Sequence, residues 1–171
     1  NTLGRVGGVA KQFGLTELQT ASLSNAFISL GKTPEVAGTA INGMLTKLMT
    51  ADKQGKKFQA VLQGMGTDSK TLKKGIKENG EQALMSFLKQ IEKLPKESQM
   101  GALVDLFGFE YADDVAALVG GLDTYQKSIN ELQKAGKDGK LEFIGSMEKE
   151  FAARSATTEN GLTLMKSGFA E

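Results

Sequence analysis

Cysteine and histidine are both absent from this chain of 171 residues. Without cysteine there are no disulfides, no thiolate nucleophiles and no cysteine-ligated zinc sites. Without histidine the chain lacks the commonest general base near neutral pH and the commonest transition-metal ligand. No apolar run approaches the roughly 18 residues that a membrane-spanning helix needs. The sequence therefore predicts no catalytic, cofactor-binding or metal site of the usual kinds, and no membrane span in this segment.

Arginine is also scarce, because Arg5 and Arg154 are the only two. The formal net charge is +1, so no overall field attracts the chain to nucleic acid or to a membrane surface. Specific recognition of bases and phosphates usually draws on the bidentate arginine side chain. Eight lysines do gather between residues 47 and 77 against two acids, and acids outnumber bases between residues 92 and 150. A solvated surface explains both imbalances, and we expect no specific nucleic-acid partner.

Leucine, alanine, methionine and lysine are abundant, whereas valine, isoleucine and aromatic residues are sparse. Unbranched side chains keep rotamer freedom on a helix, and β-branched ones pack better on sheets. Apolar positions recur at spacings of three and four, which is the helical period, and no segment alternates convincingly with a period of two. The sequence predicts an all-α fold, a multi-helix globular bundle of roughly seven to nine short to medium helices.

Glycine, proline and capping residues divide this helical pattern into segments. Thr16 and Gln19 have the spacing of a capping box, in which each side chain binds a free N–H group of the other's backbone. Thr33 can cap a helix that begins at Pro34. Proline is tolerated at the first helical position, because an N–H group there would have no partner within the helix. Pro95 ends a strong amphipathic stripe. Further breaks are expected at Gly14, Gly31, Gly66, Asn79-Gly80, Gly108 and Gly120-Gly121. Such frequent breaks exclude a single helical rod.

Two regions are expected along the chain. Residues 1–122 carry broad apolar stripes and should fold back on themselves as a compact helical core. Residues 123–171 carry a thinner stripe and should form two longer, less buried helices, an extension that packs on the core or protrudes from it. Asn1 is not an initiator methionine and no signal-peptide pattern follows it. We therefore expect the chain to be a segment of something longer.

One stretch imitates a nucleotide-binding motif. Residues Ala26–Thr33 match a relaxed P-loop expression, and Ala102–Asp105 could pose as the acid-bearing second motif. A phosphate cradle needs a glycine-rich loop between a strand and a helix. Here bulky residues with helical spacing precede Gly31, and Pro34 begins the next helix. The stretch is better interpreted as a junction between two helices. Gly64-Met65-Gly66 is likewise too short for a dinucleotide fingerprint.

Acidic residues do not form a convincing catalytic pair. Asp113 and Asp114 are adjacent, and successive residues diverge by about 100° around a helix, so they cannot chelate one ion together. We expect them instead in the first turn of a helix, where acids favour the helix dipole. Glu17, Glu35 and Glu110 could serve glycoside hydrolysis only if two of them faced each other across a pocket. Nothing in the sequence pairs them.

Small residues and methionines also favour packing over binding. Gly4 and Gly8 are four residues apart, as are Gly38 and Asn42, a spacing that lets helices approach closely. The seven methionines are adaptable fillers of core gaps, with a methionine-rich binding groove as the less favoured alternative.

Several stretches spread over nearly the whole chain stand in a consistent order: Arg5–Leu15, Ser29–Ile41, Ile91–Lys96 with Ala102–Gly108, and Phe151–Asn160. Together they resemble the core region of phage tail tape measure proteins of the lactococcal-phage type. No single stretch is decisive, but the ordered set is specific. The resemblance also covers the Gly31–Val36 junction that imitates the P-loop.

The resemblance implies a structural virion protein inside the tail tube, assembled in the host bacterial cytoplasm. Its parent would act in tail assembly and tail-length determination and would leave the tail ahead of the DNA at infection. The implied partners are tail tube proteins, tail assembly chaperones and further copies of itself, with no small-molecule substrate and no cofactor. The family has no catalytic residues in this core.

Two other functions remain to be weighed. A helical protein–protein interaction module from a system unrelated to phages would have the same composition. A peptidoglycan hydrolase would have to clear cell walls without any evident catalytic pair.

Overall fold

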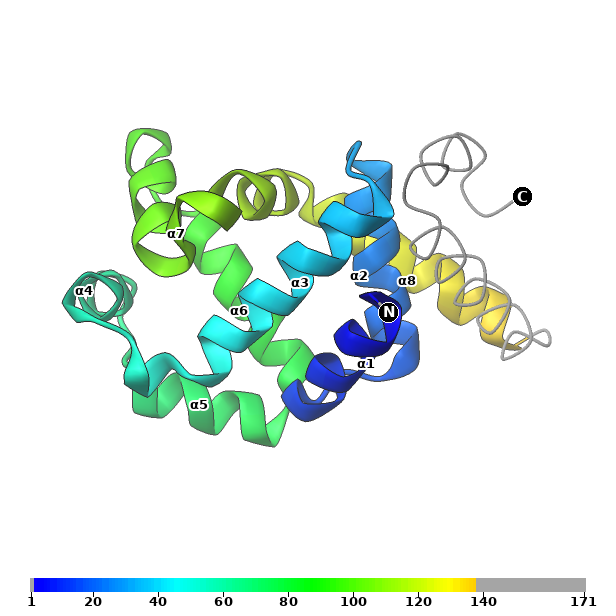
Figure 1. Ribbon diagram of the computed structural model, residues 1–171, viewed down its shortest axis with the longest axis horizontal. Coiled ribbons are helices and arrows are strands. Elements are labelled where there is room, and N and C mark those ends of the chain that lie inside the picture. The colour runs from blue at the N-terminus through cyan, green and yellow to red at the C-terminus, as the bar shows by residue number, and fades with distance from the viewer. Residues whose placement is uncertain (1, 138–171) are drawn as a thin grey trace.

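The computed structural model describes the backbone of residues 2–137 and the side chains of residues 7–135 (Figure 1). This part of the chain contains eight α-helices, one short 3₁₀ helix and no strand. The elements are α1 (Thr2–Phe13), α2 (Glu17–Ser29), α3 (Pro34–Met49), η1 (Ala51–Lys53), α4 (Lys56–Gly64), α5 (Ser69–Glu78), α6 (Gly80–Glu92), α7 (Lys96–Gly120) and α8 (Leu122–Lys137). The all-α bundle that the sequence predicts is confirmed.

The helices begin where capping residues place them. Thr16 accepts a hydrogen bond of 3.1 Å from the backbone N–H of Gln19, and the Gln19 side chain accepts one of 2.9 Å from the Thr16 backbone. This reciprocal pair is the expected capping box. At α3 the Thr33 hydroxyl accepts the backbone N–H of Val36, with Pro34 as the first helical residue. Side chains of Asp68 and Asn79 cap α5 and α6. Local sequence signals thus fix four helix starts.

α7 is interrupted at Gly108, as the break in the sequence pattern predicts. The backbone of Gly108 has φ 83° and ψ 163°, a conformation that residues with a Cβ atom rarely adopt. Two helical halves therefore meet at an elbow. The first half ends at Phe107, which is buried, and the second begins at Phe109, which is exposed.

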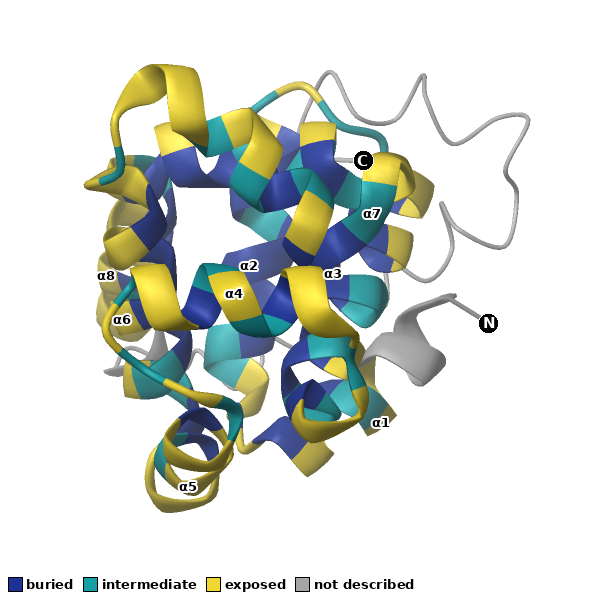
Figure 2. Ribbon diagram, turned by 90° about the vertical axis from the view of Figure 1, so that its left-hand side faces the viewer, coloured by how far each residue is buried: buried dark blue, intermediate teal, exposed yellow. Residues whose placement is uncertain are grey.

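α3 lies at the centre of the bundle, between α1, α2 and α7 (Figure 1). The buried residues of α3 recur at the helical spacing of three and four positions. Figure 2 shows a similar alternation of buried and exposed residues along the surrounding helices. Fully buried residues on α3 are Ala37, Ala40, Ile41, Met44, Leu45 and Leu48. On the α6–α7 side, the rings of Phe87 and Phe107 meet edge to face at 6.4 Å. One continuous apolar cluster joins all these helices.

α8 packs along α2, which is its main neighbour in the bundle (Figure 1). The thin apolar stripe of α8 faces the bundle, and its residues Tyr125, Ile129 and Leu132 are all buried. Asn25 donates a hydrogen bond of 3.0 Å to the hydroxyl of Ser128 across the same contact. The remaining faces of α8 are exposed. The division of the chain into residues 1–122 and 123–171 stays a prediction, and the second helix of the expected extension lies outside the described residues.

Candidate functional site

The stretch that imitates a P-loop is a junction between α2 and α3. Gly31 has φ 94°, and the backbone N–H of Lys32 donates to the carbonyl of Phe27 at 3.0 Å, which closes the end of α2. The hydroxyl of Thr33 already accepts the N–H of Val36 at 3.1 Å. No strand precedes the loop within the described part of the chain. This backbone is a helix end and a helix start, not an open phosphate cradle.

The lysine of that stretch has a protein partner. Lys32 Nζ lies 3.1 Å from a carboxylate oxygen of Asp114, and the two side chains are only 24% and 19% exposed. The ion pair ties the α2–α3 junction to α7. The position of Asp113 and Asp114 within α7 also corrects one expectation from the sequence. Because the second half of α7 begins at Phe109, Asp113 and Asp114 lie beyond its first turn, where the helix dipole acts little.

The three candidate glutamates do not form a pair. Glu17 lies in the first turn of α2, Glu35 in the first turn of α3 and Glu110 in α7, and all three are exposed. Glycoside hydrolysis needs two carboxylates held together across an enclosed site. Among the described residues there is also no group of three or more acidic side chains placed to hold a metal ion. Nor does any helix in this range combine the length and apolar character that crossing a bilayer requires.

The lysine-rich region lies on η1, α4 and α5, and most of its lysines are exposed. Lys73 Nζ forms an ion pair of 2.9 Å with Asp52, and this hydrogen bond lowers the pKa of the Asp52 carboxyl. The hydrogen bond from the backbone N–H of Thr71 lowers the pKa of Asp68. The exposed lysines of this region are Lys53, Lys56, Lys57, Lys70, Lys73, Lys74 and Lys77.

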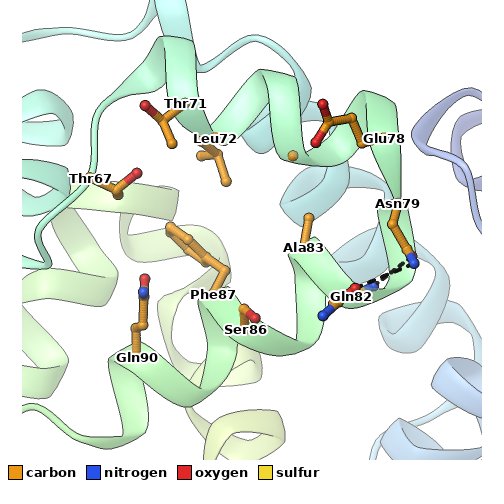
Figure 3. Close-up of a pocket in the computed structure, with 11 residues that line it drawn as sticks. Thr67, Thr71, Leu72, Glu78, Asn79, Gln82, Ala83, Ser86, Phe87 and Gln90 are labelled. Atoms are coloured by element: carbon orange, nitrogen blue, oxygen red, sulfur yellow. Dashed lines mark hydrogen bonds between the residues drawn. The ribbon is translucent and has the colours of Figure 1, made fainter.

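An open groove of about 290 Å³ separates α5 from α6 (Figure 3). Its floor is apolar, because Leu72 faces Ala83 and Phe87 across it. Hydroxyl and amide groups line its margins, with Thr67 and Gln90 towards one end and Glu78, Asn79 and Gln82 towards the other. The groove therefore has the character of a binding surface for an apolar side chain with a polar rim. It holds no arrangement of groups for chemistry.

The elbow of α7 exposes the most conspicuous apolar side chain of the described residues. Phe109 is 86% exposed, and the other large exposed apolar residues are Met100 at 45% and Val36 at 37%. Three exposed acids, Asp105, Glu110 and Asp113, lie close to Phe109 along the chain, Asp105 before the Gly108 break and the other two after it. A single exposed phenylalanine is not by itself evidence of a contact surface, because singly scattered apolar residues are normal on protein surfaces. The sequence pattern does not indicate that Phe109 is exposed, because a single apolar residue outside the apolar stripe has no distinguishing spacing.

Two buried hydroxyl groups, those of Ser24 and Tyr125, have no hydrogen-bond partner in the described part of the chain. Tyr125 is fully buried, and its hydroxyl finds no hydrogen-bond partner among the described residues. Burial raises the pKa of this phenol well above its usual range, and the nearby charge of Glu81 acts in the same direction. A neutral, enclosed phenol cannot serve as a general base. Tyr125 is a packing residue between α8 and its neighbours.

Comparison with known proteins identifies the family. The model of the family described as phage-related minor tail protein matches residues 1–108, more than half of the chain. A "Probable tape measure protein" of Halomonas phage phiHAP-1 is 28% identical over 166 residues. The match covers 93% of this chain but only 18% of that relative, so the chain spans about a fifth of its length. No solved structure matches. The chain belongs to the phage-related minor tail protein family and is a structural tail protein segment.

Proposed function

We propose that the chain is the folded core segment of a tape measure protein. In that role it acts in tail assembly and tail-length determination, and the parent protein takes part in DNA delivery. The observation that carries the proposal is the similarity to a probable tape measure protein over nearly the whole of this chain. The fold supports a specific reading of that role. A measuring rod would need one long uninterrupted helix, whereas this segment is a bundle of short helices packed around α3. The segment therefore acts as a folded domain that binds other tail proteins.

The segment works without catalysis. The candidate carboxylates lie apart on separate helices, and the lysine of the P-loop lookalike is paired with Asp114. What the surface offers is a group of exposed lysines on η1, α4 and α5 and an open groove with an apolar floor. Features of this kind suit contacts between macromolecules. The partners are tail tube proteins, tail assembly chaperones and other copies of the chain.

The site of action is the interior of the tail tube, after assembly in the cytoplasm of the host bacterium. Residues 1–122 form the compact core in this proposal, and residues 123–171 form an extension. Within the described residues this extension begins as α8, which packs along α2 and buries Tyr125 and Ile129 in the apolar core. A helical interaction module unrelated to phages is less well supported, because the family whose model matches the chain is one of phage tail proteins.

An in-frame deletion of residues 2–137 from the parent gene tests the proposal. Tails counted and measured by electron microscopy should be absent or shorter than normal. The matched control is the parent gene with Gly101 replaced by alanine, because Gly101 lies in α7 with open space where a Cβ atom would be added. Normal numbers of normal-length tails after the deletion would refute the proposed role.

A further inference from the structure

We propose that a row of lysines on α5, together with a lysine of η1, binds the phosphate backbone of double-stranded DNA without sequence preference. This lysine face consists of Lys53, Lys70, Lys73, Lys74 and Lys77. The inference deepens the proposed function and rests on it, because the chemistry of the face fits a phosphate backbone and the proposed part in DNA delivery identifies DNA as its source. Three features of the described residues carry it: the placement of the lysines, the positions of the nearby acids, and the absence of exposed apolar anchors on the same elements.

Positive charge is concentrated in one short part of the chain. Residues 52–78 hold seven lysines against three acids, a net charge of +4. The whole chain has a formal net charge of +1, so all the other residues together carry −3. A solvated surface usually intersperses the two signs. The nearly neutral total therefore conceals a local positive field.

The structure places four of these lysines along one face of α5. Lys70, Lys73, Lys74 and Lys77 stand at spacings of three and four residues, which bring side chains to the same side of a helix. All four are exposed, whereas the buried residues of α5 hold the helix against the apolar core. At 1.5 Å per residue the row is about 10 Å long.

The neighbouring acids do not cancel the lysine face. The ion pair of 2.9 Å between Lys73 and Asp52 ties η1 to α5, and Lys53 follows Asp52 within η1. The carboxylate of Asp68 accepts a backbone N–H group at the start of α5. Glu78, the last residue of α5, lines the groove towards α6 (Figure 3). One acid is therefore paired, one caps a helix and one borders the groove.

Three lysines of the face have their ammonium groups available. Lys70, Lys74 and Lys77 form no ion pair within the described residues. A stretch of duplex DNA as long as the row carries about six phosphate charges, because its two strands together place one charge on every ~1.7 Å of axis. Ammonium groups bind phosphates as point charges without a fixed geometry, which suits contact with any base sequence.

The composition of the face favours a phosphate backbone over a protein partner. The large apolar side chains exposed among the described residues are Val36, Met100 and Phe109, and none of them belongs to η1, α4 or α5. Protein interfaces draw their energy from aromatic and other apolar anchors near the centre and are depleted in lysine. Interfaces with DNA are more polar and much more positively charged. An acidic protein is the competing partner.

Fluorescence anisotropy of a short labelled DNA duplex, titrated with the 171-residue chain at several salt concentrations, tests the proposal. Two duplexes of unrelated sequence should bind equally well. If about four phosphates are neutralised, the affinity should fall on the order of 100-fold between about 50 and 200 mM salt. No binding at the lowest salt concentration, or an affinity that does not change with salt, would overturn the proposal.

A triple variant localises the binding to the lysine face. Lys70→Gln with Lys74→Gln and Lys77→Gln removes three charges and keeps three polar, exposed side chains. It should lose most of the affinity, and the slope of log affinity against log salt should become shallower by about 3. Arginine at the same three positions keeps the charges and should keep the binding. Thermal denaturation monitored by circular dichroism should show that both variants are folded.

The matched control removes the same charge from another exposed part of the molecule. Lys89→Gln, Lys93→Gln and Lys96→Gln change residues at the end of α6, just after it and at the start of α7. This second triple variant should bind DNA like the parent chain. Equal losses in the two triple variants would show that only net charge matters, and would overturn the assignment to the lysine face.

Polyglutamate represents an acidic protein partner in a competition experiment. An extended chain places its charges at about half the density of duplex DNA, so polyglutamate should compete poorly with the duplex. Polyglutamate that binds as tightly as the duplex would assign the face to an acidic protein and overturn the proposal.

The outcomes are distinguishable from those of the tail-length experiment. A chain that does not bind DNA, although its deletion shortens tails, would remove this contact and leave the tail role intact. A chain that binds DNA, although its deletion leaves tails normal, would do the reverse.

Discussion

The ring of Tyr111 in α7 packs directly on the backbone of Gly43 in α3. A Cβ atom added at Gly43 would lie 2.6 Å from Cε2 and 2.8 Å from Cζ of the ring. Real Cβ atoms do not approach other atoms so closely. The helix at the centre of the bundle therefore has no side chain at the position where the second half of α7 crosses it.

Replacing Gly43 with alanine should destabilise the protein. Alanine gains about 1 kcal/mol of helix propensity, but forcing the ring away from a packed position costs about 1–3 kcal/mol. We expect a net loss of about 1 kcal/mol in the free energy of unfolding, measured by urea denaturation. Gly101→Ala is the control, because Gly101 has open space around it and should gain stability. Equal gains at both positions would contradict this packing.

The Lys32–Asp114 pair should contribute measurably to stability. Both side chains are less than one quarter exposed, so solvent screens the pair less than an ordinary surface pair. A double-mutant cycle with alanine at both positions should give a coupling of about 0.5–1 kcal/mol. The Lys73–Asp52 pair, at 42% and 45% exposure, is the comparison and should couple more weakly. A coupling at Lys32–Asp114 no larger than that at Lys73–Asp52 would show that burial does not strengthen it.

Acid should remove the stabilising charge of Asp68. The folded-state pKa of the Asp68 carboxyl lies below its ordinary value, because the carboxylate accepts the N–H of Thr71 at the start of α5. A depressed folded pKa contributes stability above the unfolded pKa, and that contribution is lost as pH falls through the folded value. Asp68→Asn keeps a capping oxygen but does not titrate. Urea midpoints should therefore favour the parent at neutral pH and converge with those of Asp68→Asn as the pH falls below the ordinary range of an aspartate carboxyl. A gap that stays constant with pH would contradict the assignment.

Removing the hydroxyl of Tyr125 should not harm the fold. A buried hydroxyl without a hydrogen-bond partner is unfavourable, so Tyr125→Phe should raise the free energy of unfolding by about 1 kcal/mol. Tyr125→Leu keeps the apolar character but leaves space unfilled, and it should lower stability. Thermal denaturation of the three proteins checks this order. A clear loss of stability in Tyr125→Phe would show that the hydroxyl is hydrogen-bonded after all.

The sequence predicts the local structure well, because local structure depends on neighbours in the chain. Thr16 with Gln19, Thr33 with Pro34, and Gly108 each act within one helical turn, and each begins or ends a helix where expected. The pairing of α2 with α8 is different. Asn25 and Ser128 are 103 positions apart, and nothing near either residue specifies the other.

The surface features are the least predictable part. Phe109 differs from a core phenylalanine only through the direction in which Gly108 turns the chain. The groove arises from the separation between α5 and α6, which depends on how both pack against the rest of the bundle. The first-turn role expected for Asp113 and Asp114 was wrong for a related reason, since the helix begins at Phe109, several residues earlier. Such features follow from tertiary packing, which short-range patterns do not contain.

A single substitution in the parent protein tests most directly whether the folded bundle is needed for tail assembly. Leu45 is fully buried at the centre of α3, so Leu45→Asp places a charge in the core and should unfold the bundle. Tail lengths measured by electron microscopy, beside an immunoblot for the full-length parent protein, provide the readout. We predict absent or shortened tails for Leu45→Asp and normal tails for Gly101→Ala. Normal-length tails built with intact Leu45→Asp protein would contradict the proposal that this folded segment acts in tail assembly.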